Sequence, residues 1–263
     1  MCSILLHMNT FAFVTRKDEH SAALEEEIRQ RLTAAGYVEA EVPETVFVIG
    51  GDGTFLYAVR QYLEQLENVT FYGLHTGTLG FCTDYRESEL EEFLQVFLDG
   101  KTEEVRLPLL ESVSASGRTY AVNEIRIENA ARTQVMEIYI NGEKFETYRG
   151  TGMCVCTQLG STAYNRSLRG AVLAEGLPVI ELCEISGIHH SRYRSLGSPL
   201  VLKNTTEIEF RAESFQGALL GSDNAVQPLD DIQRVTVRMS PGRSVRVRRG
   251  RRISYFERLK TLF

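Results

Sequence analysis

The sequence predicts an α/β domain with a parallel sheet, followed by a β-rich, sandwich-like domain, so that the chain is α+β overall. Through residue 100, buried strands alternate with amphipathic helices, as is typical of a parallel sheet with helices packed against it. From Val105 onward the chain consists of short strands separated by turn residues. We therefore expect domains at 1–104 and 105–240, with the segment 241–263 returning to the first domain.

The elements of the first domain follow from the spacing of apolar residues. Leu24, Ile28 and Leu32 are four residues apart and predict an amphipathic helix over 18–35, which Gly36 ends as a C-terminal cap. Strands are expected at 11–14, 46–49 and 69–74, and helices from residue 55 onward and at 88–98.

The stretch Thr45–Leu56 combines a buried strand, a tight turn and the start of a helix. Gly50, Gly51 and Gly53 allow positive φ angles and the close approach of a ligand. Free N–H groups at the start of the following helix attract phosphate oxygens. The turn is therefore predicted to bind an anion.

Asp52 is unexpected in such a turn, because a carboxylate within about 4–6 Å of phosphates is repelled by them. The acid therefore needs another role. It either binds a Mg²⁺ ion that bridges the phosphates or accepts the proton of a hydroxyl group that attacks phosphorus. The remaining interpretation is a Gly/Asp turn without chemistry.

The strongest signal in the second domain is Asn141-Gly142, which lies between expected strands at 135–140 and 143–148. A type I′ turn requires φ > 0 at both central residues, so this dipeptide predicts a β-hairpin. Further strands are expected at 109–114, 119–128, 153–157, 200–202, 206–211 and 233–239, with one helix at 162–173.

Composition excludes several classes of protein. A chain of 263 residues with 43% hydrophobic residues can bury one large core or two small ones, and a net charge of −6 argues against a general affinity for nucleic acid or anionic lipid. No stretch approaches the roughly 18 apolar residues of a membrane span, and Ile4-Leu5-Leu6 is too short for a signal peptide core. We expect a cytoplasmic protein, and Met8 is a plausible alternative start.

The cysteines fit a reducing compartment, because five is an odd number and the residues are dispersed. Cys154 and Cys156 lack the Cys-x-x-Cys spacing of zinc sites. We interpret them as buried thiols of a strand and expect no protein-bound metal cluster.

The run Val245–Ile253 belongs to a cluster of seven arginines between Arg238 and Arg252. Such cations could bind RNA or an acidic partner. Val245 and Val247 alternate with arginines, however, and this pattern favours an edge strand with one face in water.

Two common nucleotide-binding motifs are incomplete. Gly100-Lys101-Thr102 resembles the end of a Walker loop, but Gln95 occupies the position of the required earlier glycine. The G-x-G-x-x-G pattern has Leu56 or Val155 at its third glycine position, which argues against a hydride-transfer enzyme.

Asn123 and Glu124 interrupt the apolar residues of the expected strand at 119–128. An adjacent amide and carboxylate can bind the two hydroxyls of a ribose, because the amide both donates and accepts while the carboxylate accepts. The alternative is a satisfied polar pair at the end of a strand.

A third motif, Gly160-Ser161-Thr162, opens the expected helix after the strand at 153–157. Backbone N–H groups and hydroxyls converge there, and Tyr164 could stack on a base. An ordinary capped helix start is the competing interpretation.

Five stretches together resemble the bacterial NAD kinase family, in that family's order and spacing, over roughly residues 46–223. The first is shared with diacylglycerol-type lipid kinases and resembles that of phosphofructokinases, whereas five in register are specific. They are Gly-Gly-Asp-Gly-Thr at 50–54, His75-Thr-Gly-Thr-Leu-Gly-Phe81, Asn123-Glu124, Gly160-Ser-Thr-Ala-Tyr164 and Gly197-Ser-Pro-Leu-Val201.

The resemblance implies phosphorylation of the adenosine ribose 2′-hydroxyl of NAD by ATP, giving NADP, with Mg²⁺ or another divalent cation. It implies that Asp52 accepts the hydroxyl proton and that Gly50, Gly51, Gly53 and Thr54 hold phosphate. It also implies NAD contacts from Asp52, Gly53, Phe81, Asn123, Glu124, Ser161, Thr162, Ala163, Tyr164, Asn165, Arg166, Ser167 and Asp223. Arg149, Thr151 and Ser186 match positions that approach the nucleotide, partly from a neighbouring subunit of a dimer or tetramer.

The chain departs from the family pattern at four places. Thr151 stands where an aspartate is usual, and Gln158-Leu159 where Pro-Thr is usual. Arg169 replaces a glycine, and Ala174-Glu175 replaces His-Pro. Because Asp52, Asn123 and Glu124 are intact, we expect altered affinity or donor preference rather than an inactive enzyme.

Two alternatives to an NAD kinase stay open at this point. A diacylglycerol-type lipid kinase would share the glycine turn but would need an apolar surface facing a membrane. A non-catalytic NAD-binding regulator would explain the departures at Thr151 and Gln158. The preferred donor could be ATP, another triphosphate or polyphosphate.

Overall fold

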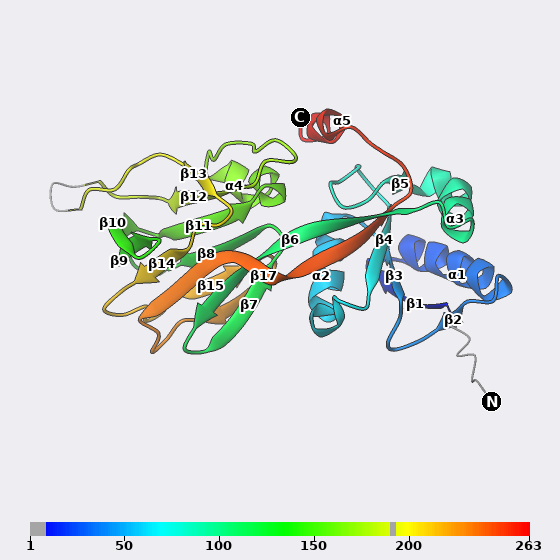
Figure 1. Ribbon diagram of the computed structural model, residues 1–263, viewed down its shortest axis with the longest axis horizontal. Coiled ribbons are helices and arrows are strands. Elements are labelled where there is room, and N and C mark those ends of the chain that lie inside the picture. Colours follow the sequence, from blue (N-terminus) through cyan, green and yellow to red (C-terminus); the bar gives the residue numbers. More distant parts are fainter. Residues whose placement is uncertain (1–8, 190–192) are drawn as a thin grey trace. The chain divides into compact units, whose positions relative to one another are not determined.

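The computed structural model describes residues 9–189 and 193–263, which form two compact units (Figure 1). The first unit contains the described residues up to Leu107 together with Ser244–Phe263, and the second is Pro108–Arg243. Both boundaries lie within strands, β6 (Glu103–Ser114) and β17 (Arg234–Arg249). The expected boundaries at 104 and 240 fall in the same two strands. The alternative start at Met8 lies outside the described residues.

The first unit contains a parallel sheet in the order β17-β4-β3-β1-β2, with β5 also paired to β4. The α/β architecture predicted for this region is confirmed. Its elements are β1 (Thr10–Thr15), α1 (Glu19–Ala34), β2 (Val38–Glu39), β3 (Thr45–Ile49), α2 (Asp52–Gln61), β4 (Thr70–His75), β5 (Tyr85–Arg86), α3 (Leu90–Leu98) and α5 (Tyr255–Lys260), with 3₁₀ turns η1 (Leu63–Gln65) and η2 (Glu87–Glu89).

Helices cover both faces of this sheet (Figure 1). Helices α1 and α3 pack on one face, where Phe47 contacts Phe93 and Phe97 edge to face at 6.0 and 4.9 Å between ring centroids. Helix α2 packs on the other, where Phe55 meets Phe71 at 5.7 Å. Burial of every residue of β3 follows from this two-sided covering.

The second unit contains two sheets whose apolar faces share one core. This sandwich-like arrangement confirms the predicted β-rich domain. One sheet contains β10 (Glu143–Gly150), β9 (Gln134–Ile140), β14 (Ile208–Arg211), the first part of β17, β6 and β7 (Gly117–Ala121). The other is ordered β13 (Leu200–Lys203), β12 (Val179–Ile185), β11 (Gly152–Thr157), β8 (Glu124–Glu128), β15 (Leu219–Ser222), β16 (Ala225–Pro228).

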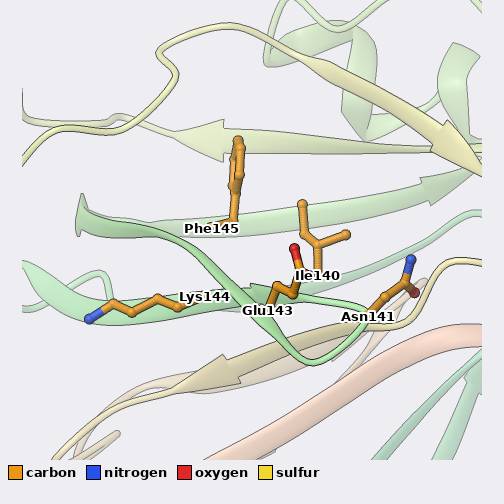
Figure 2. Close-up of a pocket in the computed structure, with 5 residues that line it drawn as sticks. All are labelled: Ile140, Asn141, Glu143, Lys144 and Phe145. Carbon is orange, nitrogen blue, oxygen red and sulfur yellow. The ribbon is translucent and has the colours of Figure 1, made fainter.

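The predicted hairpin is confirmed, because β9 and β10 pair in antiparallel register and φ is 50° at Asn141 and 85° at Gly142. A surface cavity of about 420 Å³ lies at this hairpin (Figure 2). Its lining is Ile140, Asn141, Glu143, Lys144 and Phe145, none of which was expected to bind a nucleotide.

Two predicted elements are interrupted in the structure. The strand expected at 119–128 is divided into β7 and β8, because Val122 and Asn123 turn their N–H groups to the carboxylate of Asp223. The helix expected at 162–173 is only a 3₁₀ turn, η3 (Leu159–Thr162), and a single turn, α4 (Tyr164–Ser167). It ends early because Arg169 adopts a φ of 62°, which a right-handed helix does not allow.

Several strands of the structure were not predicted from the sequence, and the last strand differs from its prediction. Strands β2, β5, β12, β15 and β16 had no expected counterpart. The prediction of an edge strand around Val245 and Val247 is wrong. Strand β17 is continuous and pairs with β4, β6 and β14, and both valines are completely buried. Cys154 and Cys156 are buried in β11, as expected.

Within the described ranges, no helix has the length and apolar character required to cross a bilayer.

Candidate active site

The glycine turn joins β3 to α2 in a geometry that requires glycine at its first position. Gly50 has a φ of 151°, and a Cβ there would lie 2.3 Å from Thr54 Oγ1. Gly51 is the N-cap residue, and no side chain of the described residues caps the helix that begins at Asp52. The first N–H groups of α2 therefore remain available to an anion.

Asp52 lies in the first turn of α2, and its carboxylate accepts two backbone hydrogen bonds. Phe81 N–H donates to Oδ2 at 2.9 Å and Cys82 N–H donates to Oδ1 at 3.0 Å. Gly80 makes room for this contact, since a Cβ there would lie 2.2 Å from Oδ1. The loop after β4 therefore sets the orientation of the carboxylate. The Phe81 side chain is buried, and its N–H group is the part that reaches Asp52.

Asn123 and Glu124 lie where β7 gives way to β8, and Asp223 holds this segment. The carboxylate of Asp223 accepts hydrogen bonds from the N–H groups of Val122, Asn123 and Glu124 at 2.8, 2.7 and 3.3 Å. Asp223 lies in the turn between β15 and β16 with a φ of 50°. Asp223 therefore fixes the backbone of the expected ribose-binding pair through these hydrogen bonds.

Glu124 is buried, with 4% of its surface exposed. Burial, reinforced by the negative charge of Asp223, raises the pKa of Glu124 to about 7, while Arg126 opposes this increase. Arg126 Nη1 donates to Oε1 at 2.9 Å. The other oxygen, Oε2, is buried and has no hydrogen-bond partner among residues 9–189 and 193–263. It can accept a hydrogen bond from a ligand hydroxyl group.

Arg126 is a site residue that the sequence analysis missed. Its Nε also donates to Glu128 Oε2 at 2.8 Å, and its guanidinium group lies 4.8 Å from the ring centroid of Tyr164. Tyr164 OH donates to Glu128 Oε1 at 2.7 Å. The signal that could have identified Arg126 in the sequence is the alternation of charged residues at 124, 126 and 128 with the apolar residues Ile125 and Ile127 along one strand.

The third motif packs directly against Asn123. A Cβ on Gly160 would lie 2.0 Å from the carbonyl oxygen of Asn123, and Thr157 N–H donates to the same oxygen at 2.8 Å. Thr157 Oγ1 also donates to the carbonyl of Val122 at 2.7 Å. The structure therefore brings the second and third motifs together in the second unit.

Residues 161–167 divide into buried and exposed groups. Ser161 and Asn165 are fully buried, and their side chains bond to the protein: Ser161 Oγ donates to Gln158 O at 2.7 Å, and Asn165 Nδ2 donates to Glu181 Oε2 at 2.8 Å. Thr162 and Ser167 hydroxyls bond to nearby carbonyls. Ala163 and Arg166 are exposed, and one face of Tyr164 is covered by Arg126.

Arg149, Thr151 and Ser186 lie together, but at the opposite end of β11 from Glu124. Thr151 N–H donates to the carbonyl of Ile185 at 3.0 Å, and Ser186 follows with a φ of 51°. Along β11, Gly152 pairs with Ile185 whereas Cys156 pairs with Glu124. These three residues therefore form a separate group within the unit.

The family model of the ATP-NAD kinase C-terminal domain matches residues 122–250. The chain is 44% identical over 177 residues to the NAD kinase of Leuconostoc mesenteroides, covering 65% of this chain and 67% of the relative. It is 32% identical over 260 residues to NAD kinase 1 of Bacillus cereus, covering 96% and 98%. Its fold is similar to the crystal structure of an NAD kinase from Archaeoglobus fulgidus in complex with ATP, with a TM-score of 0.76, 22% identity, and coverage of 96% of this chain and 99% of the other. The chain belongs to the NAD kinase family.

Proposed function

We propose that this NAD kinase transfers a phosphoryl group from ATP to the 2′-hydroxyl of the adenosine ribose of NAD, with Asp52 as the general base. The observation that carries the proposal is the carboxylate of Asp52, oriented by two backbone N–H groups beside the open start of α2. The relatives that are NAD kinases support NAD as acceptor, and the ATP complex of the archaeal enzyme supports ATP as donor. No feature of the described residues favours a lipid kinase.

The two backbone N–H groups donate to different oxygens of Asp52, and a carboxylate oxygen has more than one lone pair, so the side chain can also accept from a ligand hydroxyl group. The N–H groups at Gly51–Gly53 would bind phosphate oxygens and stabilise charge there as phosphoryl transfer proceeds. Catalysis then consists mainly of positioning and of charge stabilisation.

A divalent cation fits this chemistry when the donor's phosphates supply most of its ligands. Asp52 offers a carboxylate at the glycine turn, and no group of three His, Cys, Asp or Glu side chains suited to a metal occurs in the part of the chain that the structure describes. Mg²⁺ is commonly bound by one or two carboxylates and by substrate phosphates. When bound, it would neutralise phosphate charge, and Asp52 is the residue available to hold it.

Ribose recognition is assigned to Asn123 and Glu124. The unpartnered Oε2 of Glu124 would accept a hydrogen bond from a ribose hydroxyl, and the amide of Asn123 would donate to or accept from the other. The exposed residues Ala163 and Arg166 and the ring of Tyr164 would contact the rest of the nucleotide.

Incubation with NAD, Mg²⁺ and a panel of donors, read out with an NADP-specific dehydrogenase, tests the activity. We expect NADP to form with ATP, and to form about 10²–10⁴-fold more slowly with the variant Asp52→Asn. NAD binding in a calorimeter without NADP formation from any donor would instead identify a non-catalytic regulator. Phosphorylation of diacylglycerol in place of NAD would identify a lipid kinase.

The pH dependence of NAD binding tests the role of Glu124. Because its pKa is raised to about 7, the accepting carboxylate is progressively lost as the pH falls below that value. We expect KM for NAD to rise about tenfold per pH unit below about pH 7. The variant Glu124→Gln should have a higher KM that no longer changes in this range. An unchanged pH profile for the variant would show that another group titrates.

We further propose that the enzyme works in the cytoplasm as a homodimer or homotetramer. Large apolar side chains of the second unit support an interface, since Phe145, Ile188, Leu196 and Val201 are each more than two fifths exposed. Phe145 and Leu196 line one shared surface depression. Light scattering of the purified enzyme would give the oligomeric state, and Val201→Glu should reduce it.

A further inference from the structure

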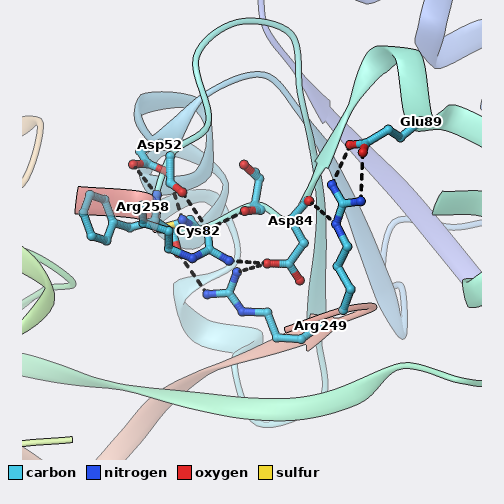
Figure 3. Close-up of polar contacts among 10 residues, drawn as sticks. Asp52, Cys82, Asp84, Glu89, Arg249 and Arg258 are labelled. Carbon is cyan, nitrogen blue, oxygen red and sulfur yellow. Dashed lines mark hydrogen bonds and ion pairs between the residues drawn. The ribbon is translucent and has the colours of Figure 1, made fainter. Parts of the chain in front are cut away.

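The loop that orients Asp52 is held from its other side by the arginine-rich C-terminal segment (Figure 3). The loop Gly80–Asp84 points the N–H groups of Phe81 and Cys82 toward Asp52. Its carbonyl groups accept hydrogen bonds from arginines far along the chain. These are Arg258 Nη1 to Gly80 and Thr83 (2.6 Å each), Arg249 Nη2 to Phe81 (2.9 Å) and Arg251 Nε to Asp84 (2.9 Å).

Arg258 is the central residue of this network. It is 7% exposed, and its guanidinium group contacts two loop carbonyls and the carboxylate of Asp84. Arg249 Nη1 donates to the same carboxylate at 2.7 Å, and Asp84 is itself 2% exposed. Two largely buried cations therefore share one carboxylate, and the carbonyls of the loop provide the remaining hydrogen-bond acceptors.

This arrangement makes displacement of the loop unfavourable. Moving the Gly80–Asp84 backbone away would leave Arg258 buried with fewer acceptors, and a buried charge without its partners is strongly destabilising. Because the same backbone presents two N–H groups to Asp52, fixing the loop also fixes the carboxylate. Arg251 extends the network to η2 through a bidentate pair with Glu89 at 2.8 and 2.6 Å.

We propose that Arg258, together with Arg249 and Asp84, is a positioning residue that orients the carboxylate of Asp52 through the backbone of Gly80–Asp84. This inference rests on the proposed role of Asp52. It gives Arg249, Arg251 and Arg258 a role within the first unit that needs neither RNA nor an acidic partner.

The variant Arg258→Met should lower kcat by about 10- to 100-fold, because small misplacements of a catalytic group cost up to about that much. KM for NAD and for ATP should change less than about threefold, since Arg258 lies behind the loop. Arg258→Lys keeps the charge but cannot contact both carbonyls and Asp84 together, so its kcat should be intermediate. Arg252→Met, in the same run but with a side chain that is 90% exposed, is the matched control and should retain wild-type kcat. All rates are compared well below the measured Tm of each variant.

A double-mutant cycle separates positioning from general stabilisation. If Arg258 acts through Asp52, Arg258→Met should have little further effect on kcat in the Asp52→Asn background. Hydrogen exchange of the Phe81 and Cys82 amides should be faster in Arg258→Met than in wild type or Arg252→Met. Multiplicative losses in the cycle, or unchanged exchange of these two amides, would overturn the inference. Full activity of Asp52→Asn alone would instead refute the proposed base, whatever the exchange data show. If Arg258→Met does not fold, the same measurements on Arg258→Lys decide.

Discussion

Substitution Asp52→Asn is expected to lower kcat by about 10²–10⁴-fold, the usual contribution of a general base. Asparagine has the size of aspartate but cannot accept the hydroxyl proton. Its amide nitrogen would face one of the two N–H groups of Phe81 and Cys82, so we expect a loss of about 1 kcal/mol in unfolding free energy from one broken hydrogen bond. Steady-state kinetics and thermal unfolding of the variant measure both effects.

Asp18 provides a matched control for this substitution. It too is an aspartate at the start of a helix, where it accepts a hydrogen bond from Ser21 N–H at 2.8 Å. Asp18→Asn should leave kcat within about twofold of wild type, because asparagine is as good an N-cap as aspartate. If Asp52→Asn and Asp18→Asn behaved alike, Asp52 would only hold the loop after β4 and would not be the base.

Substitution Gly80→Ala is expected to have the second largest effect, a decrease in kcat of about 10- to 100-fold. The added Cβ would lie 2.2 Å from Asp52 Oδ1, which is too close for any non-bonded pair. Either the carboxylate rotates away from the Phe81 and Cys82 N–H groups or the loop moves. Both responses misplace the proton acceptor. Steady-state kinetics together with a crystal structure of the variant would show which occurs.

Gly77→Ala is the control from the same loop. A Cβ at Gly77 would meet no atom within 4 Å, and its φ is not in the left-handed region. We expect kcat to change less than about threefold, because the methyl group extends into open space. Equal losses for the two alanine variants would show that flexibility of the loop, rather than the position of Asp52, limits the reaction.

Much of the fold could be predicted because the relevant signals are local. A run of β-branched and aromatic residues, such as 46–49, is typical of a strand whatever surrounds it, and three glycines directly after it indicate a turn before a helix. Asn141-Gly142 is also a local signal, because both residues readily adopt the positive φ that the hairpin turn requires. The glycine turn between β3 and α2 and the β9–β10 hairpin therefore followed from the sequence.

The helix expected at 162–173 shows where local signals are insufficient. Asn165 turns its side chain to Glu181, and Ala171 N–H donates to the same carboxylate at 2.8 Å. These bonds to β12 compete with helical hydrogen bonds, and the chain leaves the helix at Arg169. Strand β12 was itself not predicted, so these hydrogen bonds to Glu181 could not be expected from the sequence.

The sequence by itself determined most strands and helices of the first unit, the glycine turn with its acid, and the adjacent polar pair Asn123-Glu124, because each depends on residues close together in the chain. Only the tertiary structure decided that Asp223 supports that pair, that Arg126 bonds to Glu124, and that Arg258 holds the loop facing Asp52. Those partners are separated by up to 178 residues, and burial makes their hydrogen bonds obligatory. Strand order and packing decide which distant polar groups come into contact, and no local sequence pattern encodes either of them.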